Sequence, residues 1–512
     1  MTLRLSWRRR CCCRSRMRRI QSVPLVVLLL ALMGCQLGAP QAGPPATLVA
    51  PSTDSSVREL VILYTNDEHG WMEANSRSGG AAGMVERWRS EEGYVEDGPY
   101  LILSGGDMWI GPAISTWYDG ESMVEVMNAM NYDAAAMGNH EFDLGIQVLR
   151  DRLAQAEFPF LSANIRSKGI DETTSHLAIP SIVHEVSGVR VGLIGLTTTA
   201  TPRVTMPRVI AGLEFVPYQD VLPDAVSRVK AEGADVLVVL AHVCAEELRE
   251  LAPLAASLGV TVMGGGHCHQ PYTEIVNGVA VIVGGGYLTH YVRVDLAVDV
   301  ATGAVLSVTS QLRPNPPGAA DPEVGAVIDH WRVKADEALN TIIGYLNRPI
   351  QRHSDAMFNL VTDAWLEAYP AADVAITNRG GFRQDLPAGP VTLASVVAVL
   401  PFDNVLYDIE ITGAQLVESL NCSTCGAVVG GMTALGRYVL DDGRPVDPTT
   451  HYRVLVNDFN YEGGNGFRFA QYDPAAYNTA VDWRQPVIDW ILARRTGPDD
   501  PLDNYLDTSA RQ

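Results

Sequence analysis

Short apolar runs rich in β-branched residues recur along residues 57–313, and polar stretches separate them. The seven clearest runs lie at 60–65, 100–103, 134–137, 190–196, 235–240, 260–263 and 279–283. Between them, residues 122–130 and 220–231 carry apolar positions at helical spacing. Strands that alternate with amphipathic helices predict an α/β domain built in layers around a sheet.

A proline-rich break at Pro314-Asn315-Pro316-Pro317-Gly318 ends this pattern. Helical spacing over 322–340 then predicts a helix that bridges two domains, and a second α/β pattern runs over 350–493. The acidic end of the chain after Gly497 predicts a frayed tail. We therefore expect a first domain at 57–313, a linker and bridging helix at 314–345, a second domain at 346–497 and a tail at 498–512.

The N-terminus has the pattern of an export signal. Eight arginines and no acidic residue lie in the first 35 residues, and the apolar run 23–32 is shorter than a membrane span. The run ends in Leu32-Met33-Gly34-Cys35, which resembles the bacterial lipobox, in which the cysteine is lipidated and becomes the first mature residue. An uncleaved anchor helix with a chance cysteine is the alternative.

Residues 1–35 are thus predicted to be a lipoprotein signal peptide, and the Pro-, Gly-, Ala- and Ser-rich stretch 36–56 a flexible tether. The protein would be exported and held at the cell surface or the periplasmic face by the lipid on Cys35. Arg18-Arg19 leaves the choice between general and twin-arginine export open.

The charge balance is strongly acidic. The chain of 512 residues has a formal net charge of −21, and loss of the first 35 residues would make it −29. Such a surface repels polyanions, which argues against a nucleic acid polymer as partner. A small anionic substrate would need local positive charge, from metal ions or from a few arginines.

Five groups of polar side chains that suit metal ions follow predicted strands of the first domain. They are Asp67-Glu68-His69, Asp107, Asn139-His140-Glu141, His242 and His267-Cys268-His269. Open α/β sheets place their sites at the carboxyl ends of the strands, so five groups at this edge predict one shared site. Glycines beside them, such as Gly106 and Gly138, let backbone segments approach closely.

Carboxylate, imidazole and amide oxygen suit Zn, Mn, Fe, Co or Mg rather than a soft thiolate site. Two such ions about 3.5–4 Å apart can hold and deprotonate a bridging water and stabilise both ends of an in-line displacement. Such a pair needs one shared carboxylate and one acidic or positive group that is not a ligand. The sequence therefore predicts two divalent ions, Zn, Mn or similar, as cofactors.

The same motifs resemble the signature of the metallophosphoesterase superfamily. Thr65-Asn66-Asp67-Glu68-His69-Gly70 and Gly138-Asn139-His140-Glu141-Phe142-Asp143-Leu144-Gly145 narrow the resemblance to the 5′-nucleotidase family, over about residues 60–469. It implies a four-layer catalytic sandwich joined by a helix to a smaller α/β nucleotide-binding domain. It also implies that one metal is held by Asp67, His69, Asp107 and His269, and the other by Asp107, Asn139, His242 and His267.

The resemblance implies that His140, oriented by Asp143, is the catalytic pair outside both ligand sets. The spacing supports this role, because a neighbouring carboxylate can keep an imidazole protonated and aimed at phosphoryl oxygens. A purely structural hydrogen-bonding role for His140 is the alternative.

The second domain carries three further motifs of the family. Asn378-Arg379-Gly380-Gly381-Phe382-Arg383 resembles its Asn-x-Gly-Gly-x-Arg loop, and Val399-Leu400-Pro401-Phe402 and Gly463-Gly464-Asn465-Gly466-Phe467 resemble its base-binding segments. By this match Phe402 and Phe467 would stack on the base, Arg383 would bind phosphate, Asn378 would bind base or phosphate, and Asp473 would bind the ribose. Each Phe taken alone is equally consistent with core packing.

The chain departs from the family pattern at a phosphate-binding arginine. His353 stands six residues before Asn359, where the family carries Arg, and Phe358 replaces the glycine of Gly-Asn-Leu. Arg352 is the nearest candidate to supply the missing charge. Arg379, in place of a small residue of the Asn-x-Gly-Gly loop, either restores that charge or points to solvent.

Four cysteines follow Cys35, and in an exported protein they are disulfide candidates. Cys244 and Cys268 flank ligands that must converge, so a bond between them is one alternative and free thiols are the other. Cys422-x-x-Cys425 favours a short disulfide loop over a redox pair, because no thioredoxin-like pattern surrounds it.

The resemblance implies an exported phosphohydrolase that removes phosphate from 5′-nucleotides by in-line attack of a metal-bridging hydroxide. On the same scaffold, a UDP-sugar pyrophosphatase and a 2′,3′-cyclic nucleotide phosphodiesterase remain open. A non-catalytic surface lipoprotein that binds nucleotides is the alternative from another class. The expected partners are a nucleotide or nucleotide-sugar substrate and the membrane through the lipid anchor only, in a monomer or a dimer.

Overall fold

The computed structural model describes residues 56–168, 177–206 and 208–512. The predicted signal peptide, the lipobox Cys35 and all but the last residue of the predicted tether lie outside these residues. Within the described part of the chain, no helix has the length and apolar character that a bilayer span requires. We call residues 57–313 the first domain and residues 346–497 the second domain, and these boundaries remain proposals.

Two six-stranded sheets form the centre of the first domain. One has the order β14-β13-β1-β2-β3-β4, with β1 (Val57–Thr65), β2 (Tyr100–Ser104), β3 (Ala134–Ala136), β4 (Phe160–Leu161), β13 (His290–Asp299) and β14 (Ala304–Pro314). The other has the order β11-β12-β10-β9-β7-β6, with β6 (Ser181–Val186), β7 (Val189–Thr197), β9 (Val236–His242), β10 (Val262–Gly264), β11 (Tyr272–Val276) and β12 (Val279–Val283).

The central strands of both sheets are parallel, so their carboxyl ends meet at one edge. Val61–Thr65 of β1 pairs in parallel with Tyr100–Ser104 of β2, and Val191–Thr197 of β7 pairs in parallel with Val236–His242 of β9. All seven strands expected from the hydrophobic pattern are present, as are the two intervening helices. The predicted α/β class is confirmed.

Alternate residues of the central strands face two different cores. Leu60, Ile62 and Tyr64 of β1 join Val191 and Leu193 of β7 in a core between the two sheets. Val61 and Leu63 point the other way, into a core shared with helices that cover the first sheet. The resulting order is helix, sheet, sheet, helix, which is the four-layer sandwich that the sequence predicts.

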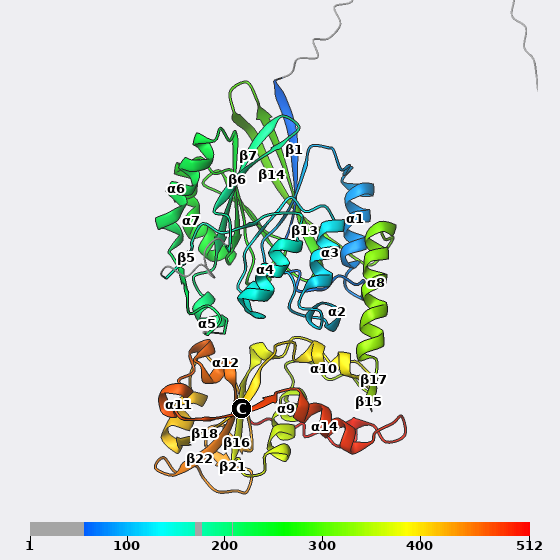
Figure 1. Ribbon diagram of the computed structural model, residues 1–512, viewed down its shortest axis with the longest axis vertical. Helices are drawn as coiled ribbons and strands as arrows, with labels where there is room; N and C mark the ends of the chain where they lie inside the picture. The colour runs from blue at the N-terminus through cyan, green and yellow to red at the C-terminus, as the bar shows by residue number, and fades with distance from the viewer. Residues whose placement is uncertain (1–55, 169–176, 207) are drawn as a thin grey trace, which may run out of the picture. The chain divides into compact units, whose positions relative to one another are not determined.

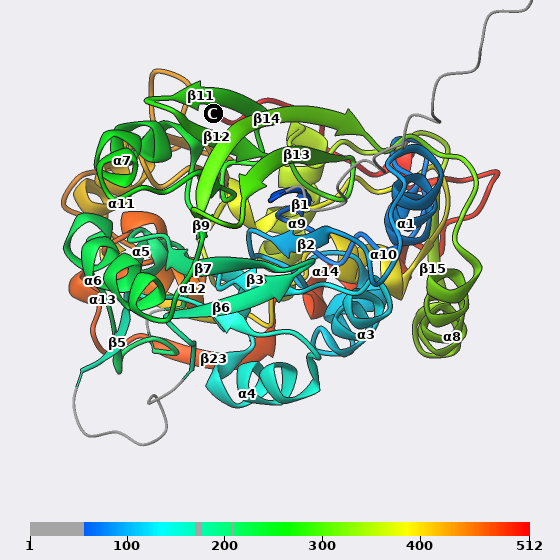
Figure 2. The same ribbon diagram turned by 90° about the horizontal axis from the view of Figure 1, so that it is seen from above.

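Helices cover the outer face of each sheet (Figures 1 and 2). On the first sheet lie α1 (Gly80–Glu91), α2 (Ala113–Thr116), α3 (Glu121–Ala129) and α4 (Gly145–Gln155). On the second sheet lie α6 (Tyr218–Ala231) and α7 (Ala245–Ser257), whose apolar faces share a core with β7 and β9. Short elements complete the domain: η1 (His140–Phe142), α5 (Thr201–Val204) and the two-stranded pair β5 (Ile165–Ser167) and β8 (Leu213–Phe215).

The bridging helix α8 (Pro322–Leu339) packs on the first domain at one end and reaches the second at the other. Asp321 caps it by accepting the backbone N–H groups of Glu323 and Val324, and Pro322 occupies the first turn, where it costs no hydrogen bond. Trp331 is buried in the core of the first domain, whereas Leu339 packs with Val397 of α10 (Leu393–Val399).

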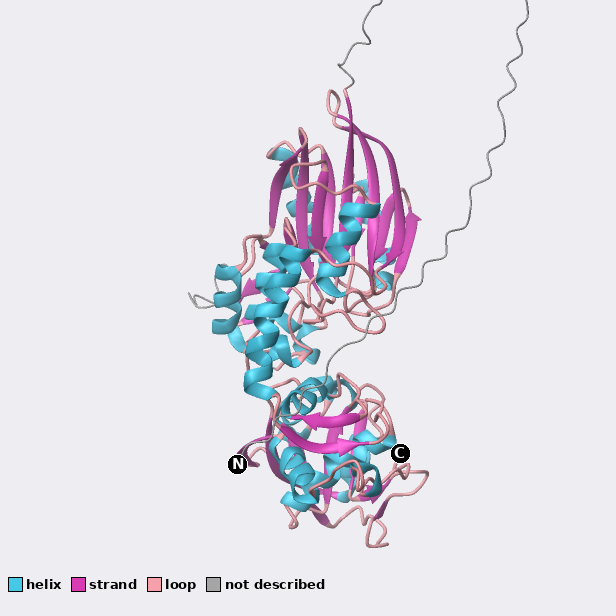
Figure 3. Cartoon of the chain, turned by 90° about the vertical axis from the view of Figure 1, so that its right-hand side faces the viewer, coloured by secondary structure: helices cyan, strands magenta, loops and turns pink. Residues whose placement is uncertain are grey.

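The second domain is built on a five-stranded sheet of order β19-β16-β22-β18-β23. Figure 3 shows strands and helices of this domain below the first domain's sheets. Its strands are β16 (Val374–Asn378), β18 (Val405–Thr412), β19 (Ala427–Gly430), β22 (His451–Asn457) and β23 (Tyr477–Asp482). Helices α9 (Asp355–Ala368) and α14 (Gln485–Arg494) cover one face, and α11 (Gly413–Leu420) lies over the other. The remaining elements are β15 (Ile342–Leu346), β17 (Gly389–Thr392), β20 (Met432–Thr433), β21 (Val439–Leu440), α12 (Asp458–Tyr461), α13 (Phe469–Tyr472), η2 (Arg379–Gly381), η3 (Gly464–Gly466) and η4 (Leu502–Asn504).

The tail prediction is wrong, because residues 498–512 pack against the second domain. Leu502 is fully buried in the core formed with α9 and α14. The Asn359 amide donates to the carbonyls of Asp507 and Ser509, and Arg511 pairs with Asp363 at 2.5 Å. The prediction rested on the acidic composition of the tail, which gives no indication that a few of its residues bind the second domain.

Candidate functional site

All seven predicted metal ligands converge at the carboxyl edge of the two sheets. Asp67 and His69 follow β1, Asp107 follows β2, and Asn139 follows β3. His242 is the last residue of β9, and His267 and His269 follow β10. The two sheets therefore contribute ligands from opposite sides of one site, at the edge where open α/β sheets build their sites.

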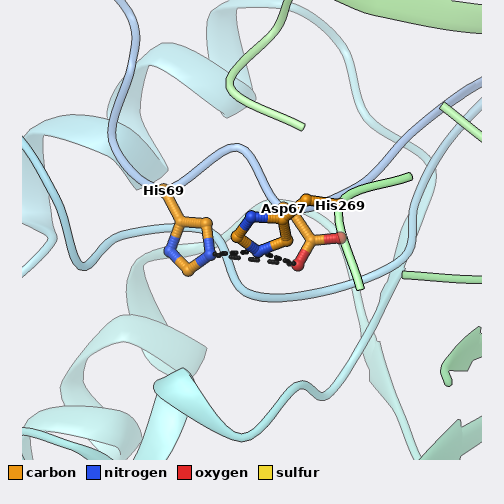
Figure 4. Close-up of side chains that lie close together, drawn as sticks. All are labelled: Asp67, His69 and His269. Carbon is orange, nitrogen blue, oxygen red and sulfur yellow. Dashed lines mark hydrogen bonds and ion pairs between the residues drawn. The ribbon is translucent and has the colours of Figure 1, made fainter. Parts of the chain in front are cut away.

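The first ligand cluster is Asp67, His69 and His269 (Figure 4). Nε2 of His269 lies 3.0 Å from Asp67 Oδ1 and 3.1 Å from Nε2 of His69. Asp67 and His69 are fully buried. Two imidazole nitrogens facing one carboxylate oxygen at these distances suit a shared divalent cation.

The second cluster is Asp107, His242 and His267. Nε2 of His242 lies 2.8 Å from Asp107 Oδ2, and the same oxygen is 4.0 Å from Nε2 of His69 in the first cluster. The other oxygen, Oδ1, accepts the backbone N–H of His140 at 2.8 Å, which fixes the carboxylate. Oδ2 therefore faces both clusters, as a bridging ligand must.

The ligand loops have an unusual backbone. Asp67, His69, Asp107, His267 and His269 all have positive φ, between 47° and 70°. Non-glycine residues seldom adopt this conformation, and such strain gathers at functional sites. Cross-loop hydrogen bonds maintain it: the Asp67 N–H donates to Gly106 O at 2.9 Å and the His69 N–H to Asp107 O at 3.0 Å.

Outer hydrogen bonds fix the tautomers of two histidines. Nδ1 of His69 lies 2.9 Å from the carbonyl of Ile110, and Nδ1 of His242 lies 2.8 Å from the carbonyl of Gly105. A carbonyl only accepts, so each Nδ1 carries a proton, and Nε2 of the neutral ring is the nitrogen that can bind a metal ion. Burial, with the charge of Arg383, holds the pKa of His69 well below its usual value.

Glu141, which follows two candidate site residues in the sequence, connects two ligand loops through the backbone. Its buried carboxylate accepts the backbone N–H groups of Asp107 at 2.9 Å, Met108 at 2.8 Å and Gly138 at 2.6 Å. Burial and the nearby charge of Asp107 raise its pKa to about 7. The position of Glu141 directly after Asn139-His140 could have indicated this role, because a carboxylate buried beside the ligand loops needs backbone N–H donors.

His140 and Asp143 lie together beside the ligand clusters. Nδ1 of His140 bonds Asp143 Oδ2. Burial opposes the charged ring, but the charges of Asp143 and Asp107 outweigh it and raise the pKa of His140 above its usual value. One His140 ring nitrogen also lies within 4.8 Å of ligand atoms of His69 and Asp107, so the site brings it within reach of the metal positions.

One further observation supports the fit of metal ions to these residues. Asn139 is buried and its Oδ1 has no hydrogen-bond partner among the described residues. A buried, unpaired amide oxygen is costly unless it has a ligand. It sits in the loop that also carries His140, and oxygen donors of this type suit divalent cations.

A cavity of about 280 Å³ runs from this site to the second domain, and we call it the first cavity. Asp107, Asn139, His140, His267 and His269 line its first-domain side. On the other side lie Asn378, Arg383, Phe402, Phe459 and Asn465. Arg383 stands between the two sides, with Nη2 3.3 Å from Nε2 of His69 and its guanidinium 5.7 Å from the Phe402 ring centre.

The predicted positions of Asn378, Arg383 and Phe402 thus agree with this cavity. Asn378 is buried at the end of β16, and its Oδ1 has no hydrogen-bond partner among the described residues. The ring of Phe402 is stacked on His140, with centres 5.8 Å apart. These side chains connect the second domain directly to the ligand edge.

Two predicted substrate contacts, Phe467 and Asp473, do not line the first cavity. Phe467 lies in the core of the second domain, stacked on Phe469 at 4.9 Å, and is only 3% exposed. Asp473 lies outside the cavity wall and accepts backbone N–H groups of Glu410 and Ala475. Phe459 and Asn465 occupy the cavity wall instead. The chain reverses between Phe459 and Phe467 through Gly463, Asn465 and Gly466, all with positive φ, which turns Phe467 inward.

Neither arginine proposed as a substitute reaches the first cavity. Arg379 is exposed and lies over the Phe358 ring, 5.0 Å from its centre. Arg352 donates to the carbonyl of Arg383 and lines a neighbouring cavity of about 690 Å³, which we call the second cavity. Phe358, which stands in place of the family's glycine, packs on Phe382 with ring centres 5.1 Å apart.

Both cysteine pairs are disulfides. Cys244–Cys268 joins the loop after His242 to the loop that carries His267 and His269. Cys422–Cys425 closes a short loop, which touches the cavity wall where Thr424 donates to the carbonyl of Asn465 at 3.3 Å.

Comparison with known proteins agrees with this geometry. Residues 339–472 match the family model of the 5′-nucleotidase C-terminal domain, and residues 114–286 match a model described as bacterial capsule synthesis protein PGA_cap. Protein UshA of Escherichia coli is 26% identical, over 85% of this chain and 90% of its own length. A 5′-nucleotidase of Vibrio cholerae is 24% identical, over 93% and 96%.

The fold is shared with a solved structure, that of a 5′-nucleotidase precursor from Thermus thermophilus. The TM-score is 0.75 at 24% identity, over 89% of this chain and 99% of the other. The similarity to UshA and to a 5′-nucleotidase, together with the ligand-rich edge of the two sheets, indicates a phosphoester hydrolase. Residues 339–472 thus match the C-terminal domain of the 5′-nucleotidase family, and most of the chain is similar to 5′-nucleotidases and to UshA.

Proposed function

We propose that the protein releases phosphate from 5′-nucleotides with two divalent metal ions. The observation that carries the proposal is the first cavity, because it joins a cluster of carboxylate and imidazole ligands to aromatic and amide side chains. A nucleotide has the same two ends, a phosphate and a flat base. The first cavity therefore combines an end suited to an anion with an end suited to a flat ring.

In this proposal Asp67, His69, Asp107 and His269 hold one ion, and Asp107, Asn139, His242 and His267 hold the other. Bound ions would supply Lewis-acid activation of the phosphate and of water. The seven side chains fit this role because they converge at one edge and because Asn139 Oδ1 lacks a hydrogen-bond partner among the described residues. Zn, Mn or a similar ion suits this donor set.

Two residues, His140 and Arg383, would stabilise the negative charge on the reacting phosphate. His140 keeps a proton because Asp143 and Asp107 raise its pKa, and its free Nε2–H can donate to a phosphoryl or leaving oxygen. Asp143 acts through His140 and is a positioning residue. Arg383, at the boundary between ligands and aromatic wall, offers a fork of N–H donors to the phosphate.

The second domain would bind the nucleoside. Phe402 and Phe459 supply ring faces for the base, and stacking of this kind contributes about 1–3 kcal/mol per base. Asn378 has a free buried amide oxygen, and Asn465, in a left-handed turn, faces the same cavity. These amides can bind base or ribose groups.

We also infer that the protein is exported. The two disulfides fit an oxidising compartment, and the N-terminal pattern supports a signal peptide with lipid attachment at Cys35. Mass spectrometry of the mature N-terminus tests this inference. A free, unprocessed Met1 in membrane-bound protein would contradict it.

A substrate panel tests the proposed activity. Purified protein with Mn²⁺ is given AMP, ATP, UDP, cyclic 2′,3′-AMP and p-nitrophenyl phosphate, with and without EDTA. The proposal predicts phosphate release from AMP that EDTA abolishes and added metal restores. Undiminished release after full removal of metal contradicts the metal role, and no release from any nucleotide favours a non-catalytic binding protein.

A further inference from the structure

We propose that the Cys422–Cys425 disulfide is a positioning element for the second-domain side of the first cavity, so that nucleotide binding depends on its oxidised state. The inference rests on the proposed function, because it concerns the affinity of the same site for the nucleoside. The bond lies in residues 421–426, between α11 and β19, which we call the disulfide loop. Neither cysteine lines the first cavity, so any effect on the substrate passes through neighbouring residues.

The disulfide loop contacts one segment of the cavity wall through Thr424. The Thr424 hydroxyl donates to the carbonyl of Asn465 at 3.3 Å. Asn465 lines the first cavity and has a φ of 55°, a conformation that non-glycine residues seldom adopt. At the next position, a Cβ added to Gly466 would lie 3.3 Å from the Thr424 hydroxyl oxygen, so the loop and this turn approach closely. Thr424 therefore supports the turn that presents Asn465 to the cavity.

The other end of the disulfide loop is bonded to a second segment of the cavity wall. The carbonyl of Gly426 accepts the backbone N–H of Arg379 at 2.8 Å. The next residue, Ala427, pairs with Asn378 in the antiparallel ladder of β19 and β16. Asn378 lines the first cavity. One short loop thus holds two wall segments that lie far apart in the sequence.

The disulfide limits the conformational freedom of this loop. Cys425 is buried in the core of the second domain, whereas Cys422 is half-buried. Thr424 is exposed, so burial contributes little to holding it in place. The covalent bond ties the outer part of the loop to the buried part. Opening it increases the number of conformations that the loop can adopt and lowers the fraction of molecules in which Thr424 contacts Asn465.

A cavity of about 420 Å³ lies beside the disulfide, and we call it the outer cavity. Both cysteines line it, as do the exposed residues Thr424 and Arg468, so a soluble dithiol can reach the sulfur of Cys422. One thiolate of the dithiol bonds to this sulfur, the disulfide bond breaks, and Cys425 leaves as a thiolate. The second thiol then displaces Cys422. Two electrons and two protons pass from the dithiol to the cysteines, and the dithiol becomes a disulfide.

The expected effect is confined to nucleotide binding. The phosphate side is held independently, because the Arg383 N–H donates to the carbonyl of Val399 at 2.8 Å and the candidate metal ligands belong to the first domain. Exported proteins form disulfides, whereas the cytoplasm keeps cysteines reduced. A chain that has not been exported would therefore bind nucleotides weakly, which would protect the nucleotides of the cytoplasm.

AMP and p-nitrophenyl phosphate separate this role from a general loss of stability. Cys422→Ser with Cys425→Ser should raise KM for AMP at least about fivefold, with less than about a twofold change in kcat for AMP or in kcat/KM for p-nitrophenyl phosphate. Thr424→Val keeps the disulfide and removes the hydroxyl, and it should raise KM for AMP at least about twofold. Ser423→Ala is the matched control, since Ser423 is an exposed residue of the same loop and lies outside the first-cavity wall.

Reversible reduction tests the same contact without changing the residues of the loop. The mature chain with Cys244→Ser and Cys268→Ser is saturated with Mn²⁺, which leaves Cys422–Cys425 as the remaining disulfide. It is reduced with dithiothreitol, the reagent is removed, and a thiol count confirms reduction. KM for AMP should rise at least about fivefold and return on reoxidation, with p-nitrophenyl phosphate hydrolysis unchanged.

An unchanged KM for AMP in the reduced protein would overturn the inference. Equal losses on both substrates would overturn it too, because the loop would then only support the fold. Oxidised wild-type protein that hydrolyses neither substrate would instead refute the proposed function. Calorimetric titration of AMP into oxidised and reduced protein then decides the inference: weaker binding after reduction supports it, and equal binding contradicts it.

Discussion

The ligand edge of the first domain is held more firmly than the aromatic side of the first cavity, formed by Phe402 and Phe459, which we call the nucleoside wall after its proposed role. Asp107 has one carboxylate oxygen fixed by the His140 N–H, and its own N–H is held by Glu141. Phe402 and Phe459 are half-buried and present ring faces, which accept any flat group. The chemistry depends on orientation within tenths of an ångström, whereas recognition depends on contact area.

This difference predicts a division of labour. Changes at the ligand edge should slow every phosphate ester, because all of them use the same ligands and His140. Changes at the nucleoside wall should affect only substrates that have a base. AMP and p-nitrophenyl phosphate, which lacks a nucleoside, therefore separate the two regions.

The largest effect is expected from His140→Asn. The variant removes a protonated donor that meets charge on the phosphate, so kcat should fall by about 10²–10⁴-fold on both AMP and p-nitrophenyl phosphate. KM should change little, and Asp143→Asn should lose less. Metal content measured on the same samples is the control. His140 lies close enough to His69 and Asp107 to bind a metal ion itself, so loss of one ion in the variant would mean that His140 is a ligand.

The next effect separates the regions. Phe459→Ala should raise KM for AMP by about 5- to 150-fold, the equivalent of about 1–3 kcal/mol of stacking, with no change for p-nitrophenyl phosphate. Phe467→Leu is the matched control, because Phe467 is a core residue and should affect stability rather than KM. If Phe467→Leu alone raised KM for AMP, the corrected assignment would be wrong.

Phe459 and Phe467 show which part of the site could not be predicted from the sequence. The convergence of the seven candidate metal ligands was predictable because polar residues that follow parallel strands meet at one edge of the sheet. Phe459 and Phe467 are chemically alike and flank one glycine-rich turn, so only the path of the chain decides which faces the cavity. The positive φ at Asn465 and Gly466 sets that path, and no composition signal marks it.

The same limit explains the other differences. Asp473 and Arg352 have the chemistry of substrate ligands, but local backbone hydrogen bonds occupy the carboxylate of Asp473, and Arg352 bonds the carbonyl of Arg383. The tail looked frayed because its sequence is acidic, whereas Leu502 and Arg511 supply the contacts that order it. Single contact residues of this kind form no periodic pattern in the sequence, so they could not be predicted from it.

The pH profile should show the ionisation of His140. Its pKa lies above the ordinary value of 6.5, so the protonated form persists at neutral pH, and kcat should fall about tenfold per pH unit once the pH rises through that pKa. Asp143→Asn removes the charge that raises the pKa and should move this alkaline limb to lower pH. A limb that stays in place in both Asp143→Asn and His140→Asn would assign it to another group.

The smallest effect concerns the disulfide between the ligand loops. Cys244→Ser with Cys268→Ser opens a loop of 24 residues' separation, which should lower the free energy of unfolding by about 3 kcal/mol and weaken metal binding. Cys422→Ser with Cys425→Ser opens a separation of 3 and should lower it by only about 2 kcal/mol, with metal affinity unchanged. Denaturant unfolding and metal titration measure both, and equal loss of metal affinity would refute a role for Cys244–Cys268 in holding the ligands.

The number of metal ions bound per chain tests the central claim most directly. Demetallated protein is titrated with Mn²⁺ in a calorimeter, and the bound metal is counted by elemental analysis. The account predicts two ions for the wild type and, because Oδ2 of Asp107 faces both clusters, loss or strong weakening of both in Asp107→Ala. One ion in the wild type, or a variant that keeps both at wild-type affinity, would contradict a pair of ions bridged by Asp107.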